Sequence, residues 1–197
     1  MRAVLASNNR HKLQEIREIL SAYGINVVLM KDLGLQIEPD ETGTTFEENS
    51  YIKAKAVMDA TNLPVIADDS GLSVDALDGA PGIHSARYGG DACSCDRDRL
   101  MLLLENMKNV PADRRTARFV CVITFLKPDG IKLVARGECE GVIDTQPRGT
   151  SEFGYDPVFY VPSEGCTFSE MGAERKNSIS HRSNALKKLC EMLEKQI

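Results

Sequence analysis

Two adjacent carboxylates are the residues best suited to acid–base or metal chemistry. Asp68 and Asp69 follow the apolar run Leu63–Ala67, which is typical of a short buried strand, and the segment Glu38–Glu41 supplies further carboxylates. Carboxylates at a strand end are costly unless they are solvated, hydrogen-bonded or bound to a cation. Hard oxygen ligands favour Mg²⁺ or Mn²⁺, and Mg²⁺ usually combines one or two carboxylates with substrate phosphates. The alternatives are an Asx-type turn at Asp68–Gly71 and a solvated acidic loop at Glu38–Glu41.

A second polar segment lies between an expected strand and the start of a helix. It consists of Ser7, Asn8, Asn9, Arg10, His11 and Lys12. Hydroxyl and amide groups, backbone N–H donors, a helix dipole and a lysine together suit a phosphate chain. The segment is not a P-loop, because the sequence contains no G-x-x-x-x-G-K pattern. The alternative is a capped helix with solvated basic residues.

Two further clusters lie near the C-terminus. In the segment 153–157, an aromatic residue beside a glycine could stack on a base while Asp156 and the backbone contact the edge of that base. A loop with a buried aromatic side chain explains this segment equally well. Lys176 and the run Ser180-His181-Arg182 supply cations before the last expected helix, where they suit a phosphate or a carbonyl oxygen. A helix cap or a surface histidine is the alternative there.

Other chemistries find little support. Cys93 and Cys95 have no partner pair at zinc-ligand spacing, and His11, His84 and His181 are too dispersed to indicate a cluster. The sequence contains no H-E-x-x-H, G-x-S-x-G or G-x-G-x-x-G pattern.

The elements expected to position these clusters alternate in type over the first third of the chain. A strand–helix–strand–helix–strand order implies crossover connections and a partly parallel sheet, so we expect an α/β fold with a mixed central sheet, flanking helices and two lobes. The expected strands are Arg2–Ala6, Asn26–Met30, Leu63–Ala67, Ala117–Leu126, Ile131–Cys139 and Pro157–Val161. The expected helices carry Leu13, Ile16 and Leu20, run from Thr45 to about Ala60, and cover Cys95–Met107 and Ser183–Lys195.

Composition limits the class of protein. The chain has 197 residues and a formal net charge of −5, which argues against a protein that coats nucleic acid but allows a local basic pocket. No apolar run approaches the roughly 18 residues that a membrane span needs, and the start of the chain has no signal-peptide pattern. With six scattered cysteines, we expect reduced thiols and a cytoplasmic protein.

Taken together, the four clusters resemble the dITP/XTP pyrophosphatase family, also called inosine triphosphate pyrophosphatases. The resemblance extends nearly from end to end. It rests on six ordered motifs: Ala6-Ser7-x-Asn9-x-x-Lys12 followed by Glu15, Thr45-Phe46-x-Glu48-Asn49-Ser50, Ala67-Asp68-Asp69-Ser70-Gly71-Leu72, Gly79-Ala80-Pro81-Gly82-Ile83-x-Ser85-Ala86-Arg87-Tyr88, Phe153-Gly154-Tyr155-Asp156-Pro157 and Ser180-His181-Arg182-x-x-Ala185.

This resemblance implies one domain over residues 1–197, with two lobes around a nucleotide-binding cleft, and a homodimer. It implies Mg²⁺-dependent hydrolysis of non-standard purine nucleoside triphosphates to the monophosphate and pyrophosphate, with one ion per subunit and Mn²⁺ as a possible substitute. Asp69 would be the catalytic carboxylate and a metal ligand. Asp40 falls where the family places a second acidic ligand, with Glu41 as a close competitor. The residues that would contact the substrate are Ser7, Asn8, Asn9, Arg10, His11, Lys12, Ser70, Phe153, Gly154, Tyr155, Asp156, Lys176, His181 and Arg182.

Two departures from the family pattern concern geometry. Ser151-Glu152 stands where many relatives carry Gly-Gly, which limits backbone freedom and adds a negative charge before Phe153. Asp40 in place of glutamate shortens the reach to a metal by about one methylene.

N–H groups of His181 and Arg182 would donate hydrogen bonds to a purine 6-oxo group, whereas the 6-amino group of adenine would leave these donors unpaired. Two rival functions remain from the residues alone: a phosphohydrolase that releases orthophosphate, and a nucleotide-binding regulatory protein without turnover. A nucleic-acid-binding domain is disfavoured by the acidic net charge and the lack of a basic stripe.

Overall fold

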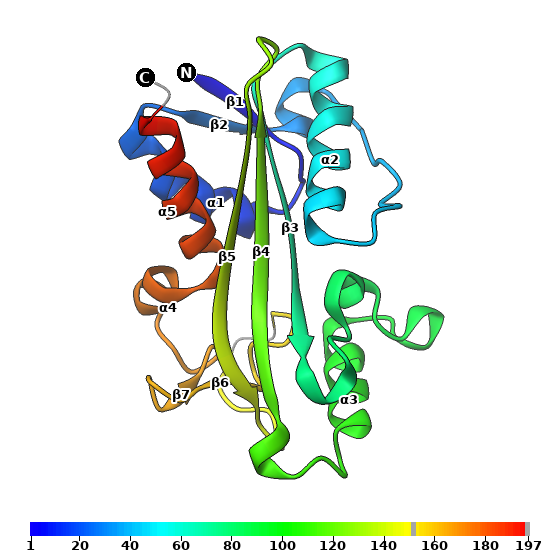
Figure 1. The fold of residues 1–197 in the computed structure, drawn as a ribbon. Coiled ribbons are helices and arrows are strands. Elements are labelled where there is room, and N and C mark those ends of the chain that lie inside the picture. The colour runs from blue at the N-terminus through cyan, green and yellow to red at the C-terminus, as the bar shows by residue number, and fades with distance from the viewer. Residues whose placement is uncertain (151–152, 196–197) are drawn as a thin grey trace. The chain divides into compact units, whose positions relative to one another are not determined.

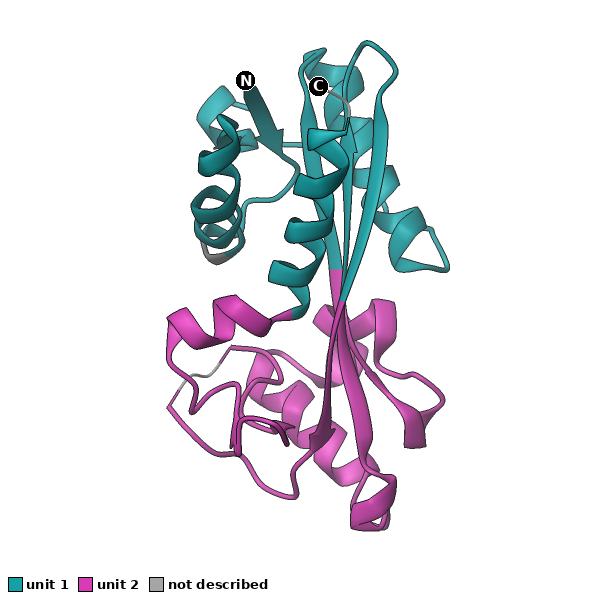
Figure 2. Ribbon diagram, turned by 60° about the vertical axis from the view of Figure 1, so that its left-hand side comes forward, with its two compact units in different colours: residues 1–69, 121–137, 181–197 teal, residues 70–120, 138–180 magenta. Residues whose placement is uncertain are grey.

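A computed structural model describes residues 1–150 and 153–195 of the chain (Figure 1). The described chain forms two compact units, coloured separately in Figure 2. Unit 1 comprises residues 1–69, 121–137 and 181–197, and unit 2 comprises residues 70–120 and 138–180. The chain passes from one unit to the other after Asp69, Val120, Gly137 and Ser180. The departure at Ser151-Glu152 lies outside the described residues.

Seven strands form one mixed sheet in the order β2-β1-β3-β4-β5-β6-β7. β1 pairs in parallel with β2 and β3, whereas β6 pairs antiparallel with β5 and β7. The expected α/β class with a mixed sheet is therefore confirmed. The strands are β1 (Arg2–Leu5), β2 (Asn26–Leu29), β3 (Val65–Val74), β4 (Thr116–Leu126), β5 (Lys132–Ile143), β6 (Phe159–Val161) and β7 (Cys166–Thr167).

Five α-helices accompany the sheet among the described residues, together with short 3₁₀ turns. They are α1 (Arg10–Leu20), α2 (Phe46–Thr61), α3 (Asp96–Asn106), α4 (Ala173–Ile179) and α5 (His181–Glu194). No helix in the described part of the chain is both long enough and apolar enough to span a bilayer.

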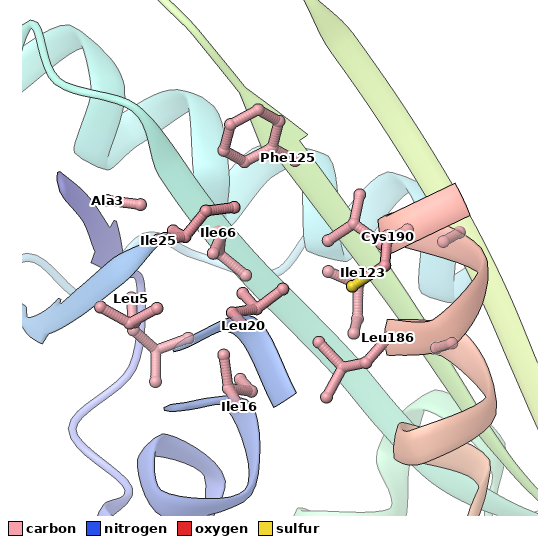
Figure 3. Close-up of a cluster of buried hydrophobic side chains, with 14 of the residues drawn as sticks. Ala3, Leu5, Ile16, Leu20, Ile25, Ile66, Ile123, Phe125, Leu186 and Cys190 are labelled. Atoms are coloured by element: carbon pink, nitrogen blue, oxygen red, sulfur yellow. The ribbon is translucent and has the colours of Figure 1, made fainter. Parts of the chain in front are cut away.

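The core of unit 1 has two sides, because successive residues of a strand point to opposite faces of the sheet. On one side, Ala3 and Leu5 of β1 and Ile66 of β3 pack with α1 and α5. Figure 3 shows Leu20 of α1 and Leu186 of α5 on this side. On the other side, the intervening residues of β1 and β3 pack against α2. The small residue Ala54 of α2 lies in this second contact.

The core of unit 2 is built around aromatic rings. The ring centroid of Phe159 lies 4.6 Å from that of Phe119 and 5.0 Å from that of Phe168. Leu100 and Leu103 of α3 belong to the same buried cluster. This cluster supports the segment that precedes β6, which includes the expected base-binding residues.

Two expectations about elements were wrong in detail, and one helix had not been predicted. Asp68 and Asp69 do not end a strand but lie inside the ten-residue β3, because the buried residues Leu72 and Val74 continue its apolar pattern. The last helix begins at His181, so His181 and Arg182 belong to its first turn rather than to the preceding loop. The short helix α4 was not expected.

Candidate active site

Asp68 and Asp69 are the most buried carboxylates of unit 1, with 2% and 6% of their surfaces exposed. They are consecutive residues of β3, so their side chains point to opposite faces of the sheet. Asp68 therefore lies on the side of α1 and α5, and Asp69 lies on the side of α2. The alternation of the strand thus gives two neighbouring carboxylates separate partners.

Asp68 is paired with two cations. Lys12 Nζ lies 2.9 Å from Asp68 Oδ2, and Arg182 Nη2 lies 3.4 Å from the same oxygen. Burial raises the pKa of Asp68, but the positive charges of Lys12 and Arg182 outweigh burial and hold that pKa well below its usual range. Asp68 is therefore a fixed negative charge that orients Lys12 and Arg182.

Asp69 shares a lysine with a second carboxylate. Lys53 Nζ, from α2, lies 2.7 Å from Asp69 Oδ1 and 2.9 Å from Glu41 Oε1. Burial raises the pKa of Asp69, and although Lys53 opposes this shift, the net direction is upward, with the charge of Glu41 contributing. An elevated pKa makes Asp69 a stronger proton acceptor than an ordinary carboxylate.

The acidic loop presents Glu41 rather than Asp40 to this cluster. Glu41 is half-buried and contacts Lys53, whereas Asp40 is exposed. The geometry therefore favours the competitor, Glu41, as the second acidic residue of the site.

The pair Asp69 and Glu41 fits a hard divalent cation. Both residues offer carboxylate oxygens, and a positive group, the ammonium of Lys53, already lies between them. In the described part of the chain, no hydrogen-bond donor reaches the buried Oδ2 of Asp69. The described residues contain no group of three or more histidine, cysteine, aspartate or glutamate side chains that could hold a metal ion. A cation held here would therefore need further oxygen ligands from water or phosphate.

The segment that follows β1 begins α1. Asn9 is the cap of that helix, because its Oδ1 accepts a hydrogen bond from Lys12 N at 3.2 Å, and Ser7 Oγ accepts one from Asn9 N at 3.1 Å. Arg10 and His11 are the first two residues of α1. The segment therefore contains both the N-terminus of α1 and Lys12, whose ammonium contacts Asp68.

A pocket of about 250 Å³ lies beside this segment within unit 1. Ser7, Asn8, Glu41 and Lys53 line it together with Glu38. The pocket therefore brings residues of the polar segment, of the acidic loop and of α2 to one concave surface. Lysine and backbone N–H groups can hold phosphate, and carboxylates can hold a divalent cation.

In unit 2, the expected base-binding residues form a cluster of their own. Lys176 Nζ pairs with the buried carboxylate of Asp156 and lies 5.6 Å from the ring centroid of Phe153. Phe153 is 41% exposed, and an exposed aromatic side chain can stack on a base. Tyr155 is buried instead, and its hydroxyl donates to Ser85 O at 2.9 Å, so burial holds the pKa of Tyr155 above its ordinary value.

His181 and Arg182 lie in unit 1, in the first turn of α5, and are 8% and 6% exposed. Arg182 Nη1 pairs with Glu15 of α1, while Nη2 contacts Asp68. Among the described residues, the buried Nε of Arg182 has no hydrogen-bond partner. Arg182 is thus oriented by two carboxylates. Ser70, the first residue of unit 2, follows Asp69 within β3.

Comparison with known proteins assigns the family. The Ham1 family pattern matches residues 3–192. The chain belongs to the Ham1 family. It is 50% identical over 194 residues, and 98% of each chain, to proteins named dITP/XTP pyrophosphatase from Shigella flexneri and from Escherichia coli (strain K12).

Solved structures of Ham1 proteins agree with this assignment. The Ham1 protein of Staphylococcus aureus matches with a TM-score of 0.90 and 41% identity over 100% of both chains. A HAM1 protein from Coxiella burnetii matches with a TM-score of 0.89 and 41% identity over 99% of both chains.

Three residues that the structure places in this site were not selected from the sequence. They are Glu15, Lys53 and Asp68, each of which forms an ion pair there. Lys53 could have been found, because Phe46, Asn49 and Lys53 follow one another at helical spacing on one side of α2. A lysine that continues a buried helix face indicates a buried negative partner. The pairing of Glu15 with Arg182 joins residues 167 positions apart, and no local pattern predicts it.

Proposed function

We propose that this protein hydrolyses ITP, dITP and XTP to the nucleoside monophosphate and pyrophosphate, using a divalent cation. The observation that carries the proposal is the buried Asp69, with its elevated pKa, beside Glu41 and Lys53. Half of the residues of the chain are identical to those of proteins named for this activity on dITP and XTP. In the cell, such an activity removes these nucleotides before they enter DNA or RNA.

The phosphates are held in unit 1 in this proposal. Ser7, Asn8, Asn9, Arg10, His11 and Lys12 bind them with the backbone donors of the first turn of α1. Support comes from the pocket that Ser7 and Asn8 share with Glu41 and Lys53. Ser70 is an additional substrate contact.

The cation is Mg²⁺, one per subunit, with Mn²⁺ as a substitute, and Asp69 and Glu41 are its protein ligands. Glu41 takes the place first expected for Asp40, because Glu41 is the carboxylate that shares Lys53 with Asp69. When bound, such a cation neutralises phosphate charge and makes water more acidic.

The reaction begins when Asp69 accepts a proton from water, whose oxygen attacks the α-phosphorus. The bond from the α-phosphorus to the bridging oxygen breaks, and pyrophosphate leaves with that oxygen. Lys12 and the N–H donors of α1 stabilise the negative charge that develops on this leaving group. Asp68 keeps Lys12 in position for this task through the 2.9 Å ion pair.

The base is bound by Phe153, Gly154, Tyr155, Asp156 and Lys176 of unit 2, together with His181 and Arg182. The exposed ring of Phe153 stacks on the purine. The guanidinium of Arg182 is a donor group suited to the 6-oxo group, and an adenine amino group would leave such a donor unpaired. This mismatch selects against ATP.

Product analysis by ³¹P NMR tests the proposal. ITP, dITP and XTP with Mg²⁺ are expected to give the monophosphate and pyrophosphate, with little turnover of ATP or GTP and none after removal of Mg²⁺ by a chelator. Orthophosphate and a diphosphate would contradict the proposal in favour of a phosphohydrolase. Tight binding of ITP without turnover would contradict it in favour of a regulatory nucleotide-binding protein.

A further inference from the structure

The motif Thr45–Ser50 contributes no side chain to the proposed chemistry, yet it contains a fully buried amide. Asn49 is 0% exposed, and its Oδ1 accepts a hydrogen bond from Gly43 N at 2.9 Å. Within the described part of the chain, the Nδ2 of Asn49 has no hydrogen-bond partner. A buried amide that is only partly satisfied costs stability. Packing alone therefore does not account for an asparagine at this position.

The hydrogen bond from Gly43 N to Asn49 Oδ1 attaches the loop that follows Glu41 to the first turns of α2. A Cβ at Gly43 would lie 2.6 Å from Glu48 Cβ and 2.7 Å from Asn49 Oδ1, so only glycine allows this close approach. The carboxylate of Glu48 continues the attachment, because it accepts from Thr44 N at 2.6 Å and from Thr45 N at 3.2 Å.

This attachment fixes the chain two residues after Glu41. Asn49 and Lys53 are one helical turn apart on α2, so the same helix fastens the loop and supplies the lysine between Glu41 and Asp69. We propose that Asn49 is a positioning residue that holds Glu41 within reach of Asp69 and so sets the affinity of the site for a divalent cation. The inference rests on the proposed function in one respect, the role of Glu41 as a metal ligand.

Binding of Mn²⁺ to the whole protein, measured from the loss of the free-ion EPR signal, tests this inference. Asn49→Ala is expected to weaken Mn²⁺ binding by about tenfold, the lower end of what loss of a residue that orients a metal ligand costs. The kcat for ITP at saturating Mg²⁺ should change much less, since Asn49 does not touch the substrate, while the Mg²⁺ concentration for half-maximal rate should rise.

Ser50→Ala is the matched control. Ser50 is the next residue, is also 0% exposed, and its hydroxyl is hydrogen-bonded to Thr124 Oγ1 at 2.7 Å instead of to the loop. This variant loses a buried hydrogen bond without releasing Gly43, so its Mn²⁺ affinity should equal that of the wild type. Equal affinities in both variants, whether both unchanged or both weakened, would overturn the inference.

Two further variants keep the result decisive. If Asn49→Ala does not fold, Gly43→Ala displaces the loop from the helix instead, and unchanged Mn²⁺ affinity in that variant would overturn the inference.

Glu41→Gln separates the inference from the proposed function. If Glu41→Gln weakens Mn²⁺ binding and Asn49→Ala does not, only the positioning role fails. If Glu41→Gln has no effect, or if the wild type binds no Mn²⁺, the proposed metal site fails and the inference falls with it.

Discussion

Adjacent residues of β3 have opposite electrostatic roles, although Asp68 and Asp69 differ only in the face of the sheet to which they point. Asp68 meets Lys12 and Arg182, and its pKa is lowered; Asp69 meets one lysine and a second carboxylate, and its pKa is raised. The first arrangement stabilises a permanent charge. The second leaves a carboxylate able to accept a proton.

Replacement of Asp69 by asparagine tests its catalytic role. Asp69→Asn removes the proton acceptor with almost no change of volume, so kcat for ITP should fall by about 10²–10⁴-fold, the usual contribution of a general base. Binding of ITP, measured by calorimetry without Mg²⁺, should persist. Wild-type turnover in this variant would contradict the role of Asp69.

Separate replacement of Glu41 and Asp40 tests which of them is the second metal ligand. Glu41→Gln should raise the Mg²⁺ concentration needed for half-maximal activity, because Glu41 lies at Lys53 beside Asp69. Asp40→Asn should leave that concentration unchanged, since Asp40 is exposed. The opposite result in a Mg²⁺ titration would restore Asp40 as the ligand.

The difference in stability between the wild type and Asp68→Asn should depend on pH. At pH 7 the variant removes the carboxylate that Lys12 and Arg182 share, and loss of one partner of a buried ion pair typically costs about 3–5 kcal/mol. The pKa of Asp68 is lower in the folded protein than the unfolded value of about 3.9, so ionised Asp68 stabilises the fold above that pH. This stabilisation is lost as the pH falls from about 4 toward the folded-state pKa.

Urea unfolding of the wild type and the variant, from neutral to acid pH, measures this difference. The gap between their free energies of unfolding should be constant near neutrality and shrink below about pH 4. A gap that grows on acidification would contradict the ion-pair role of Asp68.

At the scale of elements, the contact between β5 and α5 positions the residues of the first turn of α5. A Cβ at Gly137 would lie 2.2 Å from His181 O and 2.2 Å from Ala185 N. Gly137→Ala should therefore push α5 from the sheet, destabilise the protein by about 1–3 kcal/mol or more, and weaken nucleotide binding through Arg182.

Gly172→Ala is the control for this substitution. Gly172 has a φ of −63°, and nothing lies within 4 Å of a Cβ built there. Thermal unfolding should show a lower melting temperature for Gly137→Ala and little change for Gly172→Ala. Equal melting temperatures would show that the close contact at Gly137 does not limit stability.

The type of most elements could be predicted from the sequence. The full length of β3 and the ion pairs of its two aspartates could not. The capping-box spacing predicted the start of α2, and the structure confirms it, with Glu48 N donating to Thr45 Oγ1. The extension of β3 through Asp68 and Asp69 was missed, because two carboxylates normally end a buried strand. Their charges are compensated by Lys12, Lys53 and Arg182, which come from three different helices and are invisible to local patterns.

At the scale of the whole molecule, the motif order predicted the family, and the match over residues 3–192 confirms it. The cleft and the homodimer stay predictions from the resemblance. Sedimentation velocity at micromolar concentration should show about twice the monomer mass for a homodimer of this chain. A monomer would contradict this prediction without affecting the proposed chemistry.

Hydrolysis of ITP in ¹⁸O-labelled water, followed by mass spectrometry of the products, tests the central claim most directly. If Asp69 activates a water that attacks the α-phosphorus, one ¹⁸O should appear in the monophosphate and none in pyrophosphate. Label in pyrophosphate would place the attack on the β-phosphorus, and labelled orthophosphate would place it on the γ-phosphorus. Either result would contradict the proposed reaction.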